Sequence, residues 1–184
     1  MEAVQHQRIL KQTEVGGFFF IVFAGSLLHF TYELSGGNMV VALFSAVNES
    51  VWEHLKLPFF PALALTVYQY ARIRKTYPNL LYGKAVGIIS MPAIIVAGFY
   101  AYEAVFHSSN LAYDIGLFIA SVAAGQAISY RITLKHGAKP FNPAPVAVLA
   151  VAALLFFVFT YTPPELDLFR DPLTGEYGVH AHAH

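Results

Sequence analysis

The chain has 184 residues, of which 57% are hydrophobic and only 12% are charged; the charged fraction is about half that of an average soluble domain, which argues against a water-soluble fold. Eleven basic side chains balance eleven acidic ones, so no excess positive charge attracts nucleic acid, and we expect no nucleic-acid partner. The chain has no cysteine, which excludes disulfides, thiolate metal sites and iron–sulfur clusters.

Four apolar stretches are long enough to cross a bilayer, whose hydrocarbon core takes roughly 20 helical residues. They cover residues 16–34, 81–106, 111–130 and 144–161. No small-residue cleavage site follows the first stretch, so we interpret it as a retained span rather than a signal peptide. The predicted fold class is therefore an all-α, polytopic membrane helix bundle whose first partner is the lipid bilayer.

A fifth region, residues 38–73, is too long for one straight span. Its 36 residues would form a helix of about 54 Å, against a hydrocarbon core of roughly 30 Å. A polar run over 48–54 interrupts the region, and Pro58 and Pro61 each remove a backbone hydrogen-bond donor. We expect a re-entrant half-helix over 39–47 that dips into the membrane, followed by a fifth transmembrane helix from about Ser50 to Ile73.

The basic residues allow a test of this topology, because cytoplasmic loops of membrane proteins are enriched in Lys and Arg. Five spans and one re-entrant segment place nine of the eleven basic residues on one side and only Lys56 and Arg170 on the other. The predicted localisation is therefore the cell membrane, multi-pass, with the N-terminus cytoplasmic and the C-terminus external.

The chain changes character after Pro163 and Pro164. Residues 165–178 are polar and rich in turn-forming Pro, Gly and Asp, which predicts an ordered external C-terminal strap. We expect residues 1–178 to form a single integral membrane domain. Residues 179–184 contain three histidines and are expected to form a mobile tail.

Ionisable side chains gather where this topology places the external ends of the spans. At membrane depth each such group costs several kcal/mol unless it is paired, hydrated or bound to a metal, so we expect them to share one polar site in the outer leaflet. Three pairs are spaced four residues apart, which places the members of each pair on one face of a helix. The pairs are His29 with Glu33, Glu49 with Glu53, and Glu103 with His107.

Imidazole nitrogens and carboxylate oxygens at helical spacing are the ligands that zinc, or a dinuclear iron or manganese site, takes from a helix bundle. A divalent metal, with zinc first, is therefore the expected cofactor. The predicted metal ligands are His29, Glu33, His54, Glu103 and His107. The predicted catalytic bases are Glu49 and Glu53. The side chains expected around them are Tyr32, Asn48, Lys56 and Asp114.

Each part of this site also has a structural interpretation. A single Glu–His pair four residues apart is more often a hydrogen-bonded pair near the headgroups than part of a metal site. Glu53 and Lys56 are three residues apart and could form only a salt bridge. Asp114 could be a charge favoured by the start of a helix, and Tyr32 could belong to an aromatic belt.

Two motifs resemble a family of small multi-spanning bacterial and archaeal membrane proteins catalogued only as a domain of unknown function. The first is His-Phe-Thr-Tyr-Glu-Leu-Ser-Gly at 29–36, and the second is Val-Asn-Glu-Ser-Val-Trp-Glu-His-Leu-Lys at 47–56. The ending, residues 163–178, is also similar, so the resemblance covers nearly the whole chain. It implies a shared membrane fold that includes the strap, and it brings no activity with it. Glu103 and His107 lie outside the motifs.

Three functions of different classes are compatible with this site. The first hypothesis is a membrane-embedded, metal-dependent hydrolase acting on a lipid-like or amide substrate, with metal-bound water as nucleophile and a glutamate as general base. The second is a cation- or proton-coupled transporter or channel that uses the same acidic cluster; five spans without an internal repeat would then call for a homodimer. The third is a structural or assembly protein whose polar cluster only locks the bundle.

Overall fold

A computed structural model of the chain describes residues 2–108, 110–135 and 142–179. These residues form helices and turns without any strand, apart from one isolated β-bridge between Arg170 and Tyr177, which confirms the all-α fold class. The long helices are α1 (Glu2–Leu34), α4 (Lys56–Ile73), α5 (Leu80–Phe106), α6 (Leu111–Thr133) and α7 (Ala144–Tyr161). The short ones are α2 (Met39–Ala42), α3 (Val51–His54) and the 3₁₀ helix η1 (Asp167–Phe169).

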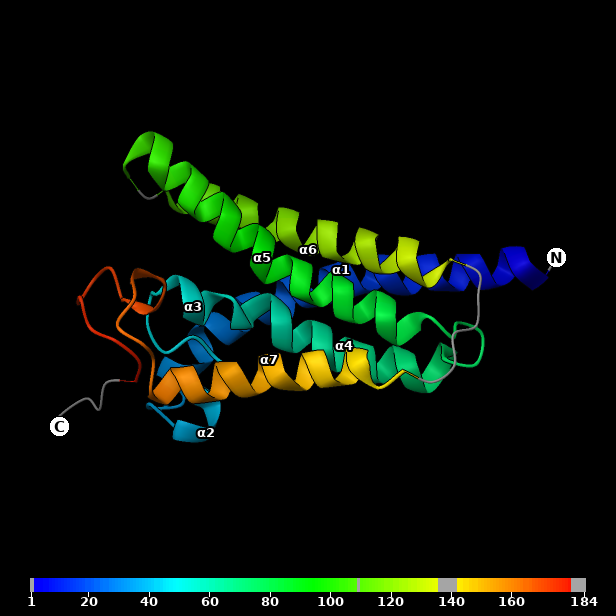
Figure 1. The fold of residues 1–184 in the computed structure, drawn as a ribbon, viewed down its shortest axis with the longest axis horizontal. Coiled ribbons are helices and arrows are strands. Elements are labelled where there is room, and N and C mark those ends of the chain that lie inside the picture. Colours follow the sequence, from blue (N-terminus) through cyan, green and yellow to red (C-terminus); the bar gives the residue numbers. More distant parts are fainter. Residues whose placement is uncertain (1, 109, 136–141, 180–184) are drawn as a thin grey trace.

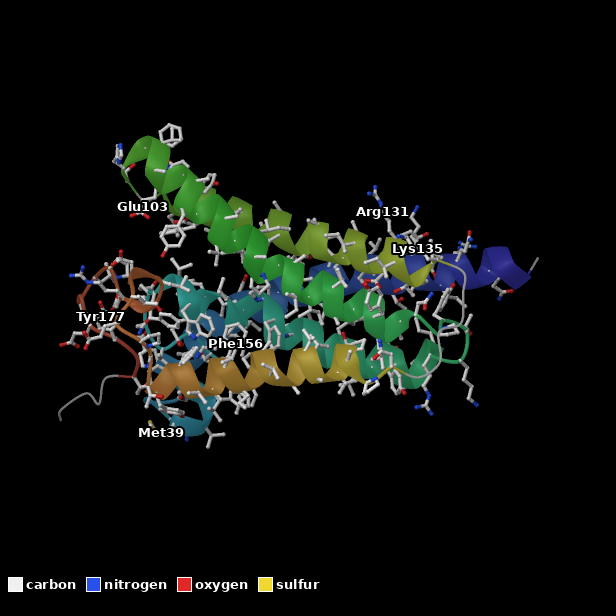
Figure 2. All side chains as sticks on the ribbon, viewed as in Figure 1. Met39, Glu103, Arg131, Lys135, Phe156 and Tyr177 are labelled. Carbon is white, nitrogen blue, oxygen red and sulfur yellow. The ribbon has the colours of Figure 1, made fainter. Side chains whose placement is uncertain are left out.

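The long helices run lengthwise through one bundle, and the two termini lie at its opposite ends (Figure 1). The short helices α2 and α3 and the segment that contains η1 lie at the end where α1 finishes, which we call the site end. The opposite end, where α1 begins and α4 and α6 finish, is the basic end (Figure 2). Its basic residues are Arg8, Lys11, Arg72, Arg74, Lys75, Arg131 and Lys135.

Within the described part of the chain, four helices are long and apolar enough to cross a membrane, judged by length and composition. They are Gln7–Leu34 within α1, together with α5, α6 and α7. Large apolar side chains cover the outward face of α1, where Phe19 is 65% exposed, Phe23 68% and Phe30 56%. An exposed apolar stripe of this kind is unfavourable in water and favourable against lipid. These are the features of a multi-pass membrane protein.

Helix α4 differs from the other long helices because most of its first half is buried. It packs between α1 and α5, and the Phe59 ring, which is 0% exposed, lies 5.0 Å from the ring of Phe156 on α7. A helix enclosed by protein can carry polar side chains that a lipid-facing helix cannot. The buried first half of helix α4 can therefore hold buried charge, and Lys56 there is 0% exposed.

Most predicted spans agree closely with the helices. The stretches at 81–106, 111–130 and 144–161 end within three residues of α5, α6 and α7. The stretch at 16–34 is an exception, because α1 already begins at Glu2. The turns of α1 that precede residue 16 are held by packing at the basic end. There Leu10 is fully buried in one cluster with Ile73 and Leu80.

The connection from α1 to α4 stays at the site end (Figure 1). Gly36 and Gly37 have φ of 70° and 76°, values that glycine adopts without strain and that allow the chain to reverse. The half-helix expected over 39–47 is shorter than predicted, since α2 ends at Ala42. The chain beyond it turns back to α1 because the polar side chain of Ser45 hydrogen-bonds there, as described below. Helical geometry resumes at Val51 and, apart from Leu55, continues through α4.

The C-terminal strap folds onto the site end. The Asn48 side chain donates to the carbonyl oxygen of Gly178 at 3.0 Å, and the amide of Val179 donates to the carbonyl of Thr160 at 3.1 Å. The Trp52 ring lies 4.7 Å from the ring of Phe169 in η1. The strap is thus ordered as expected. Of the mobile tail predicted over 179–184, only Val179 is described, and 180–184 lie outside the described residues.

Candidate metal centre

The centre depends on a close approach of α1 and α4 at Gly25. A Cβ atom on Gly25 would lie 2.6 Å from the carbonyl oxygen of Leu57 and 3.0 Å from the Phe118 ring, so a larger residue would force the backbones apart. His29 lies one turn further along α1, on the same face as Gly25. The approach therefore brings His29 against α3, the short helix that precedes α4.

His29 and His54 meet through their Nε2 atoms, which are 3.1 Å apart. On the other side of the His54 ring, Nδ1 lies 2.8 Å from the carbonyl oxygen of Ser50. Because a carbonyl can only accept, we assign the ring proton of His54 to Nδ1, which leaves a lone pair on Nε2. Such a hydrogen bond fixes the orientation of the ring, as is usual for metal-binding histidines.

Glu49 completes a group of three possible ligands. Its Oε2 atom is 3.8 Å from Nε2 of His29 and 3.5 Å from Nε2 of His54. Among the described residues, these three form the one group of at least three His, Asp or Glu ligand atoms that all lie within 4.8 Å of one another. The side chains of His29, His54 and Glu49 are 29%, 30% and 44% exposed, so the group is accessible from outside the protein.

The three ligand atoms form a triangle of the size that a zinc ion requires. A triangle with edges of 3.1, 3.5 and 3.8 Å has a centre about 2.0 Å from each corner, and zinc binds nitrogen and oxygen at about 2.0 to 2.2 Å. His29, Glu49 and His54 would hold such an ion and would leave one coordination position for water. Two imidazoles with one carboxylate are also a donor set that zinc uses in catalytic sites.

A buried ion pair between Glu53 and Lys56 lies next to this group. The two side chains are 2% and 0% exposed, and Nζ of Lys56 is 2.5 Å from Oε2 of Glu53. The hydroxyl of Thr160 donates to Oε1 of Glu53 at 3.3 Å, and the amide of Val47 donates to Oε2 at 3.1 Å. The salt bridge between Glu53 and Lys56 that the sequence analysis considered is thus present. Because both carboxylate oxygens are occupied and buried, Glu53 is poorly placed for its predicted role as a base.

Lys56 also holds the loop that carries Glu49. Its Nζ donates to the carbonyl oxygens of Ala42 at 2.8 Å and of Ser45 at 2.9 Å. The Oγ atom of Ser45 in turn accepts from the amide of Tyr32 on α1 at 3.0 Å. The buried ion pair therefore fixes the position of the loop, and through it of Glu49, relative to α1.

Three predicted ligands lie away from this group. Glu33 is exposed one turn beyond His29, and Glu103 and His107 are exposed at the end of α5. That end of α5 diverges from α3 and the strap (Figure 2). A spacing of four residues places two side chains on one helix face, but it does not decide which element that face meets. In the structure the carboxylate of the group comes from Glu49, which the sequence predicted as a base.

The side chains expected around the ligands have separate roles. The Oδ1 atom of Asn48 accepts from the amide of Ser50 at 2.9 Å, so Asn48 shapes the start of α3 as well as binding the strap. Tyr32 is buried, and its amide holds Ser45. Asp114 is half-buried in the first turn of α6 and interacts electrostatically with His54. Lys56 belongs to the buried ion pair.

A second buried ion pair lies towards the basic end, and sequence reasoning missed it. Nζ of Lys84 lies 2.7 Å from both carboxylate oxygens of Glu14, with side-chain exposures of 1% and 5%. The sequence analysis counted Lys84 among the basic residues of one membrane side and gave it no partner, although it lies within the predicted stretch 81–106. The signal that could have revealed the pair is the position of Lys84, inside the first turns of an apolar helix.

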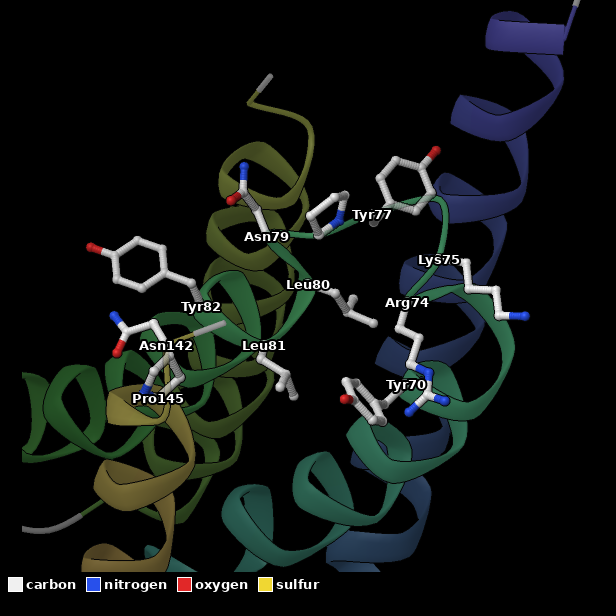
Figure 3. Close-up of a pocket in the computed structure, with 11 residues that line it drawn as sticks. Tyr70, Arg74, Lys75, Tyr77, Asn79, Leu80, Leu81, Tyr82, Asn142 and Pro145 are labelled. Atoms are coloured by element: carbon white, nitrogen blue, oxygen red, sulfur yellow. The ribbon is translucent and has the colours of Figure 1, made fainter. Parts of the chain in front are cut away.

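A surface pocket also lies at the basic end, between the end of α4 and the starts of α5 and α7 (Figure 3). Its lining includes Tyr70, Arg74, Lys75 and Asn142, and Cζ of Arg74 lies 4.8 Å from the centre of the Tyr70 ring. None of its described lining residues is an acid or a histidine. The pocket is therefore separate in place and in chemistry from the metal centre.

No curated protein and no solved structure matches the chain. A family model, described as a family of unknown function (DUF6512), matches residues 2–179. The match covers every described helix and the strap, and the resemblance to an uncharacterised family is thereby confirmed. The chain belongs to the family of unknown function DUF6512.

Proposed function

We propose that this protein is a membrane-embedded zinc protein whose centre, formed by His29, Glu49 and His54, hydrolyses an ester or amide bond in a lipid-like substrate. The observation that carries the proposal is the ligand triangle, whose centre is about 2.0 Å from all three ligand atoms.

The chemistry follows from the donor set. Three protein ligands leave one zinc position for water, and a metal bound here would lower the pKa of that water towards about 7. Hydrolysis adds this oxygen to the carbonyl carbon, breaks the C–O or C–N bond and passes a proton to the leaving group. The exposure of the three ligands, between 29% and 44%, leaves room for a substrate.

The proton acceptor in this proposal is Asp114. Glu49 is assigned as a ligand, and both oxygens of Glu53 are occupied in the buried ion pair. Asp114 is half-buried, comes from a different helix and interacts electrostatically with His54. A carboxylate that is not a ligand can take the proton of the attacking water directly or through one further water.

A lipid-like substrate fits the position of the centre. His29 lies five residues before the end of the span Gln7–Leu34, so it sits roughly 7 Å below that end of the helix, where acyl chains meet headgroups. The surface beside it is apolar, since the ring of Phe30, next to His29, is 56% exposed. A substrate with an apolar chain and a polar ester or amide group could reach the centre from the lipid.

The proposal includes a membrane arrangement. Helix α4, together with α3, provides a fifth span, which is buried rather than lipid-facing. The basic end is cytoplasmic, as the positive-inside rule expects, and the metal centre faces the external leaflet together with the strap. Reporter fusions at residue 75 and at the C-terminus would test this arrangement, which requires opposite sides for the two positions.

Metal analysis of detergent-purified protein tests the centre. The chain should be truncated after Val179, because the three histidines of the sequence beyond it could bind metal by themselves. The truncated protein should hold about one zinc per chain, and His54→Ala should lose it. The matched control is His107→Ala, which removes an exposed histidine outside the group and should keep the zinc. Equal zinc content in both variants would contradict the proposed centre.

Hydrolysis is tested on lipid-like esters and amides in mixed micelles. Asp114→Asn should keep the zinc and lose activity by about a hundredfold or more, in the range of general-base catalysis. Glu103→Gln, which changes an exposed acid at the diverging end of α5, is the control and should keep its activity. Zinc-loaded protein that hydrolyses none of these substrates would leave a metal centre but contradict the hydrolase.

A cation- or proton-coupled transporter is the second candidate function. It is favoured by one observation, the presence of two buried ion pairs, since ionisable groups at membrane depth often mark ion pathways. The predicted acidic cluster itself does not support it, because Glu103 is not in the group of ligand atoms that contains Glu49. Cation flux into proteoliposomes that stops in Glu14→Gln but persists after zinc removal would favour transport over hydrolysis.

A further inference from the structure

Unpaired buried polar atoms are concentrated in one half of the bundle. Among the described residues, five buried side-chain nitrogen or oxygen atoms have no hydrogen-bond partner. Four of them belong to Gln69, Tyr77 and Thr133, which lie on the half of the bundle that includes the basic end. A buried polar atom without a partner costs about 1 to 3 kcal/mol. Several such atoms in one place therefore point to a ligand that satisfies them together.

Two of these residues, Thr133 and Gln69, can be placed relative to the ion pair of Glu14 and Lys84. The hydroxyl of Ser129 donates to Oε1 of Glu14 at 3.3 Å, and Thr133 follows one turn later on the same face of α6. A Cβ atom on Gly83 would lie 2.4 Å from Oγ1 of Thr133, so the unpaired hydroxyl is beside the residue next to Lys84. Thr133 thus lies one helical turn from Ser129, which bonds to the pair.

Gln69 lies at the same level of the bundle. Helices α1 and α4 run in opposite directions, with Leu65 against Gly17 and Ile73 in one cluster with Leu10. On α4, Gln69 is midway between Leu65 and Ile73. On α1, Glu14 is close to midway between Gly17 and Leu10. Gln69 and Glu14 are therefore at about the same level of the bundle. Gln69 is 0% exposed, and neither its amide nitrogen nor its carbonyl oxygen has a partner among the described residues.

Charge decides which ligand this place can hold. Glu14 and Lys84 neutralise each other, and the other polar groups are uncharged, so an added ion of either sign would have no counter-charge at membrane depth. The unpaired atoms include donors and acceptors, because hydroxyls do both and the amide of Gln69 offers one of each. Water is a neutral ligand that can donate and accept in the same way.

We propose that water enters the bundle from the basic end and hydrates the Glu14–Lys84 pair, making it a proton-exchange site within the membrane. The pocket at the basic end lies at the entrance, since Tyr77 and Leu80 are among its lining residues (Figure 3). Tyr77 is 9% exposed, and its hydroxyl is one of the unpaired atoms. In this proposal, water passes Tyr77 and Thr133 on its way from the pocket to Lys84.

This site is independent of the metal centre. It uses neither His29 nor His54, and it opens at the opposite end of the bundle (Figure 1). A proton that arrives through water binds a carboxylate oxygen of Glu14, and Lys84 remains a hydrogen-bond donor to it. The site therefore offers what a proton-coupled protein needs on the basic side, whether or not the metal centre is a hydrolase.

The absence of cysteine makes the test direct, because a single introduced thiol can be followed. Thiols react as thiolates, which form in contact with water and not in a dry apolar interior. Thr133→Cys and Gln69→Cys, in proteoliposomes, would be treated with Ag⁺, a membrane-impermeant ion of nearly the size of water, from one side at a time. The control is Thr66→Cys, a buried α4 position whose hydroxyl already bonds to the carbonyl of Ala62.

Both test variants should react at least about tenfold faster than Thr66→Cys, and only from the side of the basic end. Rates equal to that of the control would overturn the proposal. Since a variant could fail to fold, Gln69→Leu supplies a second measurement. If the amide is hydrated, this variant melts at a lower temperature than the parent protein. If the amide is dry and unpaired, replacing it with an apolar group raises the melting temperature, and that result would also overturn the proposal.

Discussion

The two ends of the bundle hold the same kind of buried ion pair and use it differently. At the site end, Lys56 and Glu53 are three residues apart in one helical segment, and Lys56 also binds two carbonyls of the preceding loop. Towards the basic end, Lys84 and Glu14 come from α5 and α1, and their polar neighbours are helix side chains. A buried ion pair can thus organise a loop or join two helices, depending on what satisfies its remaining hydrogen bonds.

The surroundings of the two pairs differ as well. At the site end the pair is fully bonded, and the groups with chemical potential, His29, Glu49 and His54, lie beside it and are partly exposed. Towards the basic end the ion pair is itself the proposed functional group, and buried atoms without a partner lie in the same half of the bundle. We therefore expect the first pair to act through position and the second through its own proton exchange.

The largest effects should come from breaking each pair. Lys56→Met and Lys84→Met each leave a buried carboxylate without its partner, which should lower the free energy of unfolding by about 3 to 5 kcal/mol. The comparison predicts that only Lys56→Met also weakens zinc binding, because only Lys56 positions the Glu49 loop. Thermal unfolding in detergent and zinc titration measure the two effects.

The control for both variants is Lys75→Met, an exposed lysine at the basic end, which should leave stability and zinc binding almost unchanged. If Lys56→Met keeps the zinc affinity of the parent protein, the buried pair does not position the loop. The double variant with Glu53→Leu should regain part of the stability, since removing both charges is less costly than removing one.

A smaller effect is expected at Gly25. The added methyl of Gly25→Ala would meet the carbonyl of Leu57 at 2.6 Å, which should separate α1 from α4, cost about 1 to 3 kcal/mol and lower zinc affinity. Gly16→Ala is the matched control, because a Cβ atom there meets nothing within 4 Å and alanine favours a helix over glycine by about 1 kcal/mol. Zinc affinity that is equal in the two variants would show that this approach does not place His29.

Acidification should release zinc while the ion pairs persist. Histidine binds metal only when its ring is neutral, and the ordinary pKa of imidazole is about 6.5. With His29 and His54 as ligands, zinc affinity should fall by at least about tenfold between pH 7.5 and pH 5.5. Titration with a zinc indicator measures this, and an affinity that does not change over this range would argue against histidine ligands.

The smallest effect is expected for Asn48→Ala. It removes the hydrogen bond that shapes the start of α3 and the one to Gly178 in the strap, at a cost of about 0.5 to 2 kcal/mol. The strap should then be cleaved faster by protease, while Glu103→Ala, at the diverging end of α5, should leave cleavage unchanged. An intact strap in both variants would contradict the role given to Asn48.

The individual helices could be predicted because each depends on its own residues. Lipid requires every backbone group in a span to be satisfied within the helix, so long apolar runs such as 144–161 determine where a helix lies. The extension of α1 to Glu2 could not be predicted in the same way. Its residues are partly polar, and they are held by contacts of Leu10 and Glu14 with helices that lie far away in the sequence.

The candidate centre shows the same limit. Two of its ligands, His29 and His54, were predicted, because histidine within or beside a span is costly without a partner. The predicted ligands Glu33, Glu103 and His107 shared a helix face with another polar residue, but the positions of neighbouring elements decide what that face meets. Glu49 was singled out for another role, and the loop that brings it to the histidines is held by Lys56.

By itself, the sequence determined that this chain forms apolar helices long enough for a membrane and that its ionisable groups need partners. The tertiary structure alone decided which partners they find. Periodicity describes one helix at a time, whereas the group formed by His29, Glu49 and His54 depends on a close approach at Gly25 and on a buried lysine. Both are contacts between segments, and no spacing along the chain encodes them.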